Sequence, residues 1–299
     1  MPESSKHSVT YAQWVDQIGT QLAAAGLDDG GAEYVVLARN NWRHTDFVIH
    51  GRNLIPAPLR QQLASDAQRL LAAEPAQYVV GQAWFYGRPF QVGPGVLIPR
   101  PETEELVAWL LDSLPAQQPL RILDMGTGSG AIAVTVASER PDWQVTATDI
   151  SPRALAVAEK NAAILAPHSI HFLSGDMFQP VSDKQYDVVI SNPPYVAWSE
   201  LGVMDQSVKK FEPSIALFAP HDGLAFYEQF IREVPAHLTA AGRIFLEYGY
   251  QQAPALKTML AAPDWQADFR RDMAGHPRMV QAIWQTQKSS TMSKKEGNR

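Results

Sequence analysis

The sequence predicts an α/β protein with a mostly parallel sheet and helices on both faces. Two observations carry this prediction. From Glu102 onward, strand patterns and helical patterns alternate along the chain, which is typical of parallel strands joined by helices. A glycine-rich segment at 126–130 follows one of these strands and precedes a helix. This order places a tight turn at the carboxyl end of a strand, where open α/β sheets bind ligands.

The composition favours a soluble protein of about two domains. The chain has 299 residues, of which 45% are hydrophobic and 19% charged, close to the average for globular proteins. It contains no cysteine, which excludes disulfides, thiolate zinc sites and cysteine nucleophiles. The formal net charge of −6 argues against a partner that is mainly phosphate backbone.

No targeting or membrane segment is expected. The first residues, MPESSKHSVTYAQW, lack the continuous apolar stretch of a signal peptide. The longest uncharged apolar run, at 131–137, is far shorter than the ~18 residues that a membrane span needs. We therefore expect a cytoplasmic protein.

Residues 1–80 are expected to form a helical domain. Apolar residues recur at helical spacing over 11–22, and Thr10 with Gln13 fits a capping box at the start of this helix. A longer amphipathic helix is expected to begin after Pro58. Nothing in this domain has the pattern of a catalytic site.

A connector and a larger domain are expected to follow. The connector, 81–101, contains a predicted β-hairpin, because 84–92 is rich in strand formers with turn residues inside. In the domain 102–287 we expect helices at 102–114, 131–138, 152–165 and 223–238, and strands at 121–124, 145–149, 170–173, 186–191, 243–248, 267–273 and 278–284. The last two strands are expected to pair with each other and to give the sheet one antiparallel edge. Residues 288–299 are polar, basic and without periodicity, so we expect a disordered tail.

The glycine-rich loop predicts a site for a nucleotide-type cofactor. Its glycines let the backbone approach a ligand, and the following helix presents free N–H groups. Asp124 stands before the first glycine and suits a ligand with an aliphatic ammonium group, which S-adenosylmethionine has and NAD lacks. Asp149 ends the next strand, where its carboxylate can accept both ribose hydroxyls of either cofactor. The loop itself leaves the choice between these cofactors open.

The segment Asn192-Pro193-Pro194-Tyr195 predicts a site for a planar amino group. It follows the strand 186–191, at the ligand-binding edge of the sheet. The two prolines have no backbone N–H, so the Asn192 side-chain oxygen and the Pro193 carbonyl are left to accept hydrogen bonds from one NH₂ group. Tyr195 can lie against the flat face of the group that carries this nitrogen. Adenine, guanine, cytosine and the side chain of glutamine all fit this description.

Four segments together resemble the bacterial protein-(glutamine-N5) methyltransferases. They are Asp124–Gly130 (DMGTGSG), Thr148–Ile150 (TDI), Asn192–Tyr195 (NPPY) and Ile98–Glu104 (IPRPETE). Phe211-Glu212-Pro213 resembles the branch that acts on peptide chain release factors. Leu246–Gly249 (LEYG) and the pattern Asp272…Gly275…Arg278 also fit the family. The resemblance covers roughly residues 10–287.

The resemblance implies a fold, a reaction and a partner. The fold is that of the class I S-adenosylmethionine-dependent methyltransferases, Rossmann-like with a mostly parallel seven-stranded sheet. The reaction is methyl transfer from S-adenosylmethionine to the side-chain amide nitrogen (N5) of the glutamine in the Gly-Gly-Gln motif of release factors. Residues 1–80 would then bind the release factor.

The resemblance also implies site residues. Those for the cofactor are Gly126, Thr127, Gly128, Ser129, Gly130, Asp149, Met177 and Asn192, and those for the substrate glutamine are Asn192, Pro193, Pro194 and Tyr195. Asn192 and Tyr195 would be catalytic. Met177 stands where the family often has an aromatic side chain beside the adenine, and a thioether can also pack on a purine. The eight histidines show no metal-ligand spacing, so no metal is expected.

Three alternatives remain beside this reading. The first is an amino methyltransferase that acts on adenine or guanine in nucleic acid, which the acidic charge and the lack of a basic groove-reading segment oppose. The second is a dinucleotide-dependent oxidoreductase, opposed by Asp124 and by 192–195, which hydride transfer does not need. The third is a helical adaptor without enzymatic activity. We expect no membrane partner and no direct sequence-specific contact with nucleic acid.

Overall fold

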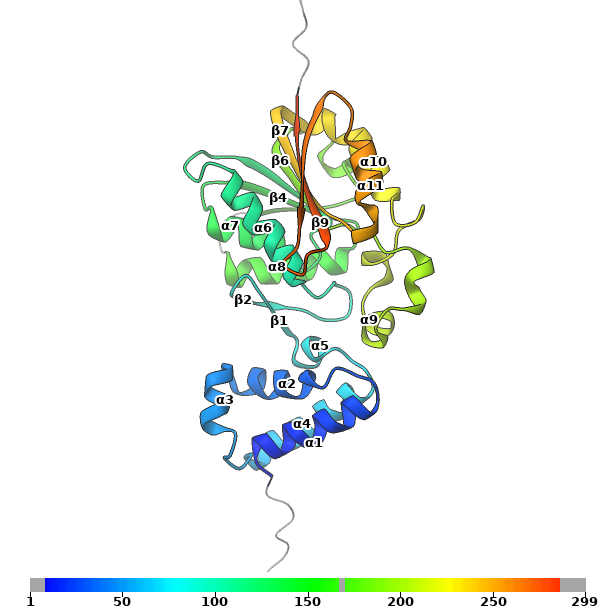
Figure 1. Cartoon of the computed structure of the whole chain (residues 1–299). Helices are drawn as coiled ribbons and strands as arrows, with labels where there is room; N and C mark the ends of the chain where they lie inside the picture. The colour runs from blue at the N-terminus through cyan, green and yellow to red at the C-terminus, as the bar shows by residue number, and fades with distance from the viewer. Residues whose placement is uncertain (1–8, 167–169, 286–299) are drawn as a thin grey trace, which may run out of the picture.

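The computed structural model describes residues 9–166 and 170–285. A helical part formed by the start of the chain lies below a larger part that contains the main sheet, and a β-hairpin lies between them (Figure 1). The expected tail at 288–299 lies outside the described residues. Within the described residues, no helix is long and apolar enough to cross a membrane.

The helical part is held by one core to which each amphipathic helix turns its apolar face. Its helices are α1 (Tyr11–Ala24), α2 (Gly30–Asn40), α3 (His44–His50), α4 (Ala57–Leu71) and α5 (Ala76–Val80). The capping box is confirmed, because the side chains of Thr10 and Gln13 each accept a hydrogen bond from the other residue's backbone N–H. Helix α4 begins one residue before Pro58 rather than after it, since a proline is tolerated in the first turn of a helix.

A buried ion pair joins two helices of this part. Asp66 on α4 is fully buried, and its two carboxylate oxygens accept hydrogen bonds from Arg39 on α2, both at 2.9 Å. Arg39 also donates to the carbonyl oxygen of Val79 on α5. One guanidinium group therefore holds α2, α4 and α5 together.

The predicted hairpin is present and packs onto the larger part. Its strands β1 (Gln82–Phe85) and β2 (Arg88–Gln91) pair antiparallel. Phe85 and Phe90 are fully buried in the core on one face of the main sheet. The buried side chain of Asn161 accepts a hydrogen bond from the N–H of Gln91 at 2.7 Å and donates one to its carbonyl oxygen at 3.0 Å. The division of the chain at residues 80, 101 and 287 stays a prediction.

The main sheet confirms the expected mostly parallel architecture with seven strands in the described residues. Its order is β5-β4-β3-β6-β7-β9-β8. The strands are β3 (Arg121–Met125), β4 (Gln144–Asp149), β5 (Ile170–Ser174), β6 (Tyr186–Ser191), β7 (Leu238–Glu247), β8 (Trp265–Arg271) and β9 (Pro277–Trp284). The expected antiparallel pairing of the last two strands at one edge is confirmed. Strand β9 runs antiparallel to both of its neighbours, so the edge strand β8 points the same way as the parallel strands.

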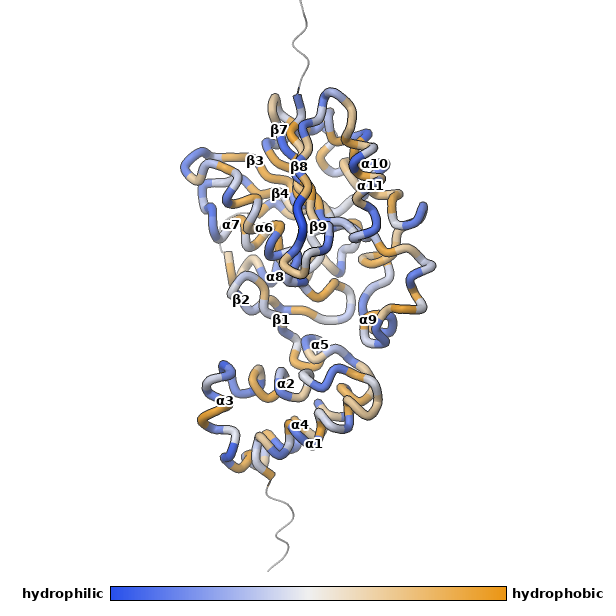
Figure 2. Tube along the Cα trace, in the orientation of Figure 1, coloured by the Kyte–Doolittle hydropathy of each residue, from blue (hydrophilic) through white to orange (hydrophobic). Residues whose placement is uncertain are grey.

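Helices cover both faces of this sheet and leave the strand ends between them. On one face lie α6 (Pro101–Ser113), α7 (Ala131–Glu139) and α8 (Pro152–Leu165), and on the other α10 (Ala225–Glu233) and α11 (Ala253–Met259). The inner strand β3 is mostly hydrophobic, and β8 is mostly hydrophilic (Figure 2). This difference fits an edge strand that contacts water.

In the part of the chain after the hairpin, two boundaries differ from the sequence prediction by five residues and two helices were not predicted. The helix expected over 223–238 ends at Glu233, because Pro235 follows and cannot continue it. Strand β7 begins at Leu238 instead of 243, with a register shift against β6. The short helices α9 (Gln206–Phe211) and α11 were not predicted; at six and seven residues they are too short to show a clear apolar period.

We expect replacement of Asp66 with alanine to lower the free energy of unfolding by about 3 kcal/mol, because it leaves the Arg39 guanidinium partly buried without its carboxylate. Urea unfolding monitored by circular dichroism measures this change. Asp16→Ala, at an exposed position on α1, is the control and is expected to have little effect. Equal losses in the two variants would show that the ion pair does not stabilise the helical part.

Candidate functional site

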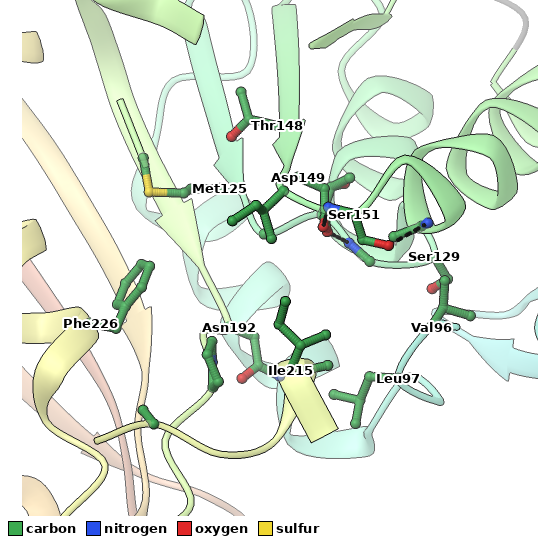
Figure 3. A pocket seen from close by; sticks show the side chains of 18 of the residues that line it. Val96, Leu97, Met125, Ser129, Thr148, Asp149, Ser151, Asn192, Ile215 and Phe226 are labelled. Atoms are coloured by element: carbon green, nitrogen blue, oxygen red, sulfur yellow. Dashed lines mark hydrogen bonds between the residues drawn. The ribbon is translucent and has the colours of Figure 1, made fainter. Parts of the chain in front are cut away.

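A cavity of about 370 Å³ opens at the carboxyl ends of β3, β4, β5 and β6. Its size falls within the ~300–1,000 Å³ of small-molecule sites. Figure 3 shows Asp149 and Ser151 on one side of this cavity and Asn192 and Ile215 on the other. Of the residues expected from the sequence, it is lined by Gly126, Thr127, Gly128, Ser129, Asp149, Met177, Asn192 and Pro194. Gly130, Pro193 and Tyr195 do not line it.

The three glycines of the loop after β3 have two different surroundings. Gly126 and Gly128 have φ of +73° and +57°, and an added Cβ at either would meet no atom within 4 Å. Both therefore present open backbone to the cavity. At Gly130 an added Cβ would lie 3.1 Å from Cβ of Ala158 and 3.2 Å from Cγ2 of Val134. This glycine lets α7 and α8 pack closely, and its place is behind the cavity wall.

Asp149 is fixed at the end of β4 by two backbone N–H groups. Its Oδ2 accepts from Gly128 at 2.9 Å and its Oδ1 from Ser151 at 2.8 Å. Burial raises the pKa of this carboxyl, and the two hydrogen bonds act in the opposite direction. Each carboxylate oxygen has a further lone pair, so Asp149 can accept two more donors from the cavity.

Asp124 lies beneath the loop rather than in the cavity wall. It is fully buried, and its Oδ2 accepts from Thr127 Oγ1 at 2.6 Å and from the N–H of Ala133 at 3.1 Å. Its Oδ1 has no partner. Burial raises the pKa of Asp124 to about 7, with a further increase from the nearby charge of Asp149. The sequence suggested that Asp124 meets a cationic ligand, but Asp124 does not line the cavity. Its hydrogen bonds hold the glycine loop instead.

Asn192 is held by a chain of hydrogen bonds that ends at a buried carboxylate. Its Nδ2 donates to Thr103 Oγ1 at 2.9 Å, and Thr103 Oγ1 donates to Glu247 Oε2 at 2.7 Å. The Tyr195 hydroxyl donates to Glu247 Oε1 at 3.2 Å. Thr103 is 4% and Glu247 1% exposed. Burial raises the pKa of Glu247 to about 7, although the hydrogen bond from Thr103 and the charge of Arg278 lower it.

The turn that contains Tyr195 is fixed through its backbone as well. Gln252 Nε2 donates to the carbonyl oxygen of Tyr195 at 2.8 Å, while its Oε1 accepts from the N–H of Gly249 at 3.0 Å. An added Cβ at Gly223 would lie 2.0 Å from the same carbonyl oxygen. Gly223 has a φ of +81°, so both the close approach and the backbone conformation require glycine there.

The segment after β6 is tied across the cavity to the stretch before α6. Glu212 Oε2 accepts from the N–H of Ile98 at 3.1 Å, and its Oε1 accepts from Arg100 at 2.6 Å. Arg100 lines the cavity, as do Ile215 and Phe218 on the segment beyond Glu212. This ion pair keeps two walls of the cavity together although the residues are more than a hundred positions apart.

Sequence reasoning found the motifs but missed Thr103, Glu212 and Glu247 as contacts within the site. The stretch 98–104 contains two carboxylates, Glu102 and Glu104. The inward-facing side chain is the threonine between them. A helical register for α6 could have indicated this, since Thr103 shares a face with the buried Leu106 and Val107.

The comparisons with known proteins match nearly the whole chain. Residues 104–211 match the family model "Methyltransferase small domain" and residues 13–81 match "PrmC N-terminal domain". The release factor glutamine methyltransferase of Enterococcus faecalis is 42% identical over 272 residues, with 90% of this chain and 98% of that protein covered. The protein of the same name from Staphylococcus aureus is 38% identical over 280 residues, with 92% and 100% covered. The crystal structure of a methyltransferase from Pyrococcus furiosus has a TM-score of 0.51 at 16% identity, over 77% of this chain and 98% of that one.

We expect Asp124→Asn to flatten part of the pH dependence of stability. The carboxyl has a raised pKa in the folded protein, so the folded state holds its proton more tightly than the unfolded state. Its contribution to stability is therefore lost as the pH rises from the unfolded pKa, near 4, to about 7. The asparagine does not ionise and still offers an oxygen to Thr127 and Ala133.

Urea unfolding at intervals from about pH 5 to about pH 8 tests this expectation. The wild type should lose more stability over this range than the Asp124→Asn variant does. The control is Asp142→Asn, at an exposed position, which should follow the wild type. Parallel curves for wild type and Asp124→Asn would contradict the assignment.

Proposed function

The chain belongs to the family of release factor glutamine methyltransferases, and we propose that it methylates the side-chain amide nitrogen (N5) of the glutamine in the Gly-Gly-Gln motif of peptide chain release factors, with S-adenosylmethionine as the methyl donor. Its fold is that of a class I S-adenosylmethionine-dependent methyltransferase. The observation that carries the proposal is the orientation of Asn192. Since Nδ2 donates to Thr103, Oδ1 is left to accept an N–H group at the cavity wall.

The residues around the cavity fit S-adenosylmethionine. Asp149 has two oxygens with free lone pairs for the ribose hydroxyls, and the open backbone at Gly126 and Gly128 suits the methionine part. We assign Thr127 and Ser129 to the same part of the ligand, and Met177 to a face of the adenine. Gly130 supports this site through the packing of α7 and α8. When bound, S-adenosylmethionine supplies an electrophilic methyl group on its sulfonium.

The substrate amide would be held by the turn after β6. Asn192 Oδ1 and the Pro193 carbonyl oxygen accept the two N–H groups of the glutamine side chain, and Tyr195 lies beside its plane. Pro193 and Tyr195 do not line the cavity in this structure, so we place the substrate amide at the edge of the cavity beyond Asn192. Two fixed acceptors define both the position of the nitrogen and the direction of its lone pair.

Positioning supplies most of the rate enhancement in this proposal. An amide nitrogen is a weak nucleophile because its lone pair is delocalised into the carbonyl group. Alignment of this nitrogen with the methyl group is worth ~7–11 kcal/mol at best. The two acceptors also stabilise the positive charge that develops on the nitrogen. The proton then leaves to water, since neither Asn192 nor Tyr195 is a base.

Release factors are the partners in this proposal, and the cytoplasm is where the enzyme would meet them. Direct sequence-specific binding of nucleic acid is not part of it. The net charge of −6 and the names of the relatives favour a protein substrate over the alternative of a base in nucleic acid. Residues 1–80, which include most of the stretch that matches "PrmC N-terminal domain", would hold the release factor.

The first test is methyl transfer from labelled S-adenosylmethionine to a purified release factor. We expect label on the wild-type factor and none on a factor whose Gly-Gly-Gln glutamine is changed to alanine. Asn192→Ala in the enzyme should lower kcat by about 10²-fold or more, because it removes an acceptor that orients the nitrogen. Transfer to DNA or RNA in place of the factor would overturn the proposal. A rise in KM with kcat unchanged would overturn the role of Asn192.

A second prediction concerns the helical part. Val48 and Ile49 on α3 are 71% and 69% exposed, and adjacent exposed apolar side chains are suited to a protein partner. Changing both to aspartate should raise KM for the intact release factor by about tenfold and leave KM for a short Gly-Gly-Gln peptide unchanged. The control is Ile164→Asp on α8, which is 61% exposed and far from the helical part in sequence. Equal effects on factor and peptide would contradict a docking role for this surface.

A further inference from the structure

The buried carboxylate of Glu247 reaches both side chains assigned to the substrate amide. It ends β7, the strand beside β6 in the sheet, and the turn with Asn192 and Tyr195 follows β6. One oxygen accepts from Tyr195 directly, and the other accepts from Thr103, which contacts Asn192. Neither Glu247 nor Tyr195 lines the cavity, so Glu247 acts on the substrate only through other residues.

The number of protons shared by Glu247, Thr103 and Asn192 fixes the orientation of the Asn192 amide. An ionised carboxylate accepts hydrogen bonds and cannot donate one. The single hydroxyl proton of Thr103 is therefore directed at Glu247, which leaves Thr103 as an acceptor toward Asn192. An acceptor selects the NH₂ end of the Asn192 amide, so Oδ1 must point the other way. A protonated Glu247 would donate to Thr103 and free the Thr103 proton to bond Oδ1 instead.

We propose that Glu247 and Thr103 are positioning residues that make Asn192 present its oxygen, and not its NH₂ group, to the substrate amide. This inference rests on the proposed function, because it assumes that the acceptor is an NH₂ group held by Asn192. With the Asn192 amide reversed, two NH₂ groups would face each other and the substrate would lose its acceptor. The hydrogen bonds from Asn192 to Thr103 and on to Glu247 thus select one of two orientations of the Asn192 amide, which have nearly the same shape.

Charged and polar groups on α6, α10 and β9 surround Glu247, and some of them favour its ionised form while others oppose it. The positive charge of Arg278 on β9 favours the ionised carboxylate. Arg278 Nε donates a hydrogen bond to Asp272 Oδ2 at 3.1 Å. Glu102 on α6 acts against ionisation. The hydroxyl of Tyr227 on α10 donates to the backbone carbonyl of Glu247. Arg278 lowers the pKa of Glu247 through its charge, and its hydrogen bond to Asp272 keeps it in place.

Rigid surroundings make this selection effective. Thr103 lies in the first turn of α6 and is β-branched, which restricts its χ1 angle. Glu247 is paired with Met279 of β9 in the sheet. The turn with Tyr195 is fixed by Gln252. These contacts restrict the partners that the hydroxyl of Thr103 can reach.

The first experiment compares Thr103→Val with Thr103→Ser. Valine keeps the shape of threonine and removes the hydroxyl, so we expect kcat for a Gly-Gly-Gln peptide to fall by about 10²-fold. Serine keeps the hydroxyl, and kcat should recover at least tenfold relative to valine. The Kd for S-adenosylhomocysteine, measured by calorimetry, should stay within about threefold of the wild-type value in both variants. Equal losses in kcat, or no loss with valine, would overturn the proposal.

The second experiment uses Glu247→Gln and the pH profile of kcat. In the wild type, kcat should fall as the pH drops through about 7, since the protonated form of Glu247 no longer fixes the Thr103 proton. Glutamine cannot ionise, so its lower kcat should lack this acidic limb. An acidic limb unchanged in Glu247→Gln would assign it to another group and overturn the role of the ionised carboxylate.

The outcomes separate this inference from the proposed function. If the wild type fails to label the peptide and labels another acceptor, the proposed function is wrong, and the comparison of valine with serine is repeated with that acceptor. A serine rescue there would support the orientation of Asn192 independently of the substrate. Label on the peptide without a serine rescue would leave the proposed function standing and remove the inference.

Discussion

The site depends on one hydrogen-bonded carboxylate at the end of the fifth strand along the chain in the main sheet. Glu247 joins α6 through Thr103, the turn after β6 through Tyr195, and α10 through Tyr227. A buried charge is costly unless its surroundings satisfy it. Here hydroxyl groups and a nearby arginine do so, and the same contacts define where the side chains that we assign to the substrate lie. Stability and geometry of the site therefore have a common origin.

A second buried carboxylate, Asp124, supports the loop on the other side of the cavity. Asp124 anchors the glycine loop as Glu247 anchors the asparagine turn, and burial raises the pKa of both to about 7. The two acids lie at the ends of strands that flank β6 in the sheet order. Each holds a loop that has little regular structure of its own. The parallel sheet supplies the fixed points, and the loops supply the surfaces that contact ligands.

The sequence was sufficient for the sheet, the hairpin and the glycine loop because their signals are local. The capping box at Thr10 and the turn at 126–130 involve neighbours a few positions apart. The bond between Thr103 and Glu247 spans 144 positions, and no local pattern indicates it. Likewise, the start of β7 depends on its pairing with β6, and Gly130 differs from Gly126 through its close contacts with Val134 and with Ala158 on another helix. The motif identified the loop, and tertiary packing decided which of its glycines meets the cavity.

The order of these elements along the chain has a consequence for how the protein is made. The helical part draws all its core contacts from the first 80 residues, so it can fold as soon as it emerges from the ribosome. The cavity instead needs β7 to deliver Glu247 and β9 to deliver Arg278. During most of its synthesis the nascent chain thus carries a helical part whose core is complete and a candidate site that is unfinished. Methyl transfer begins only when nearly the whole chain has been released, so an interrupted translation product would be inactive.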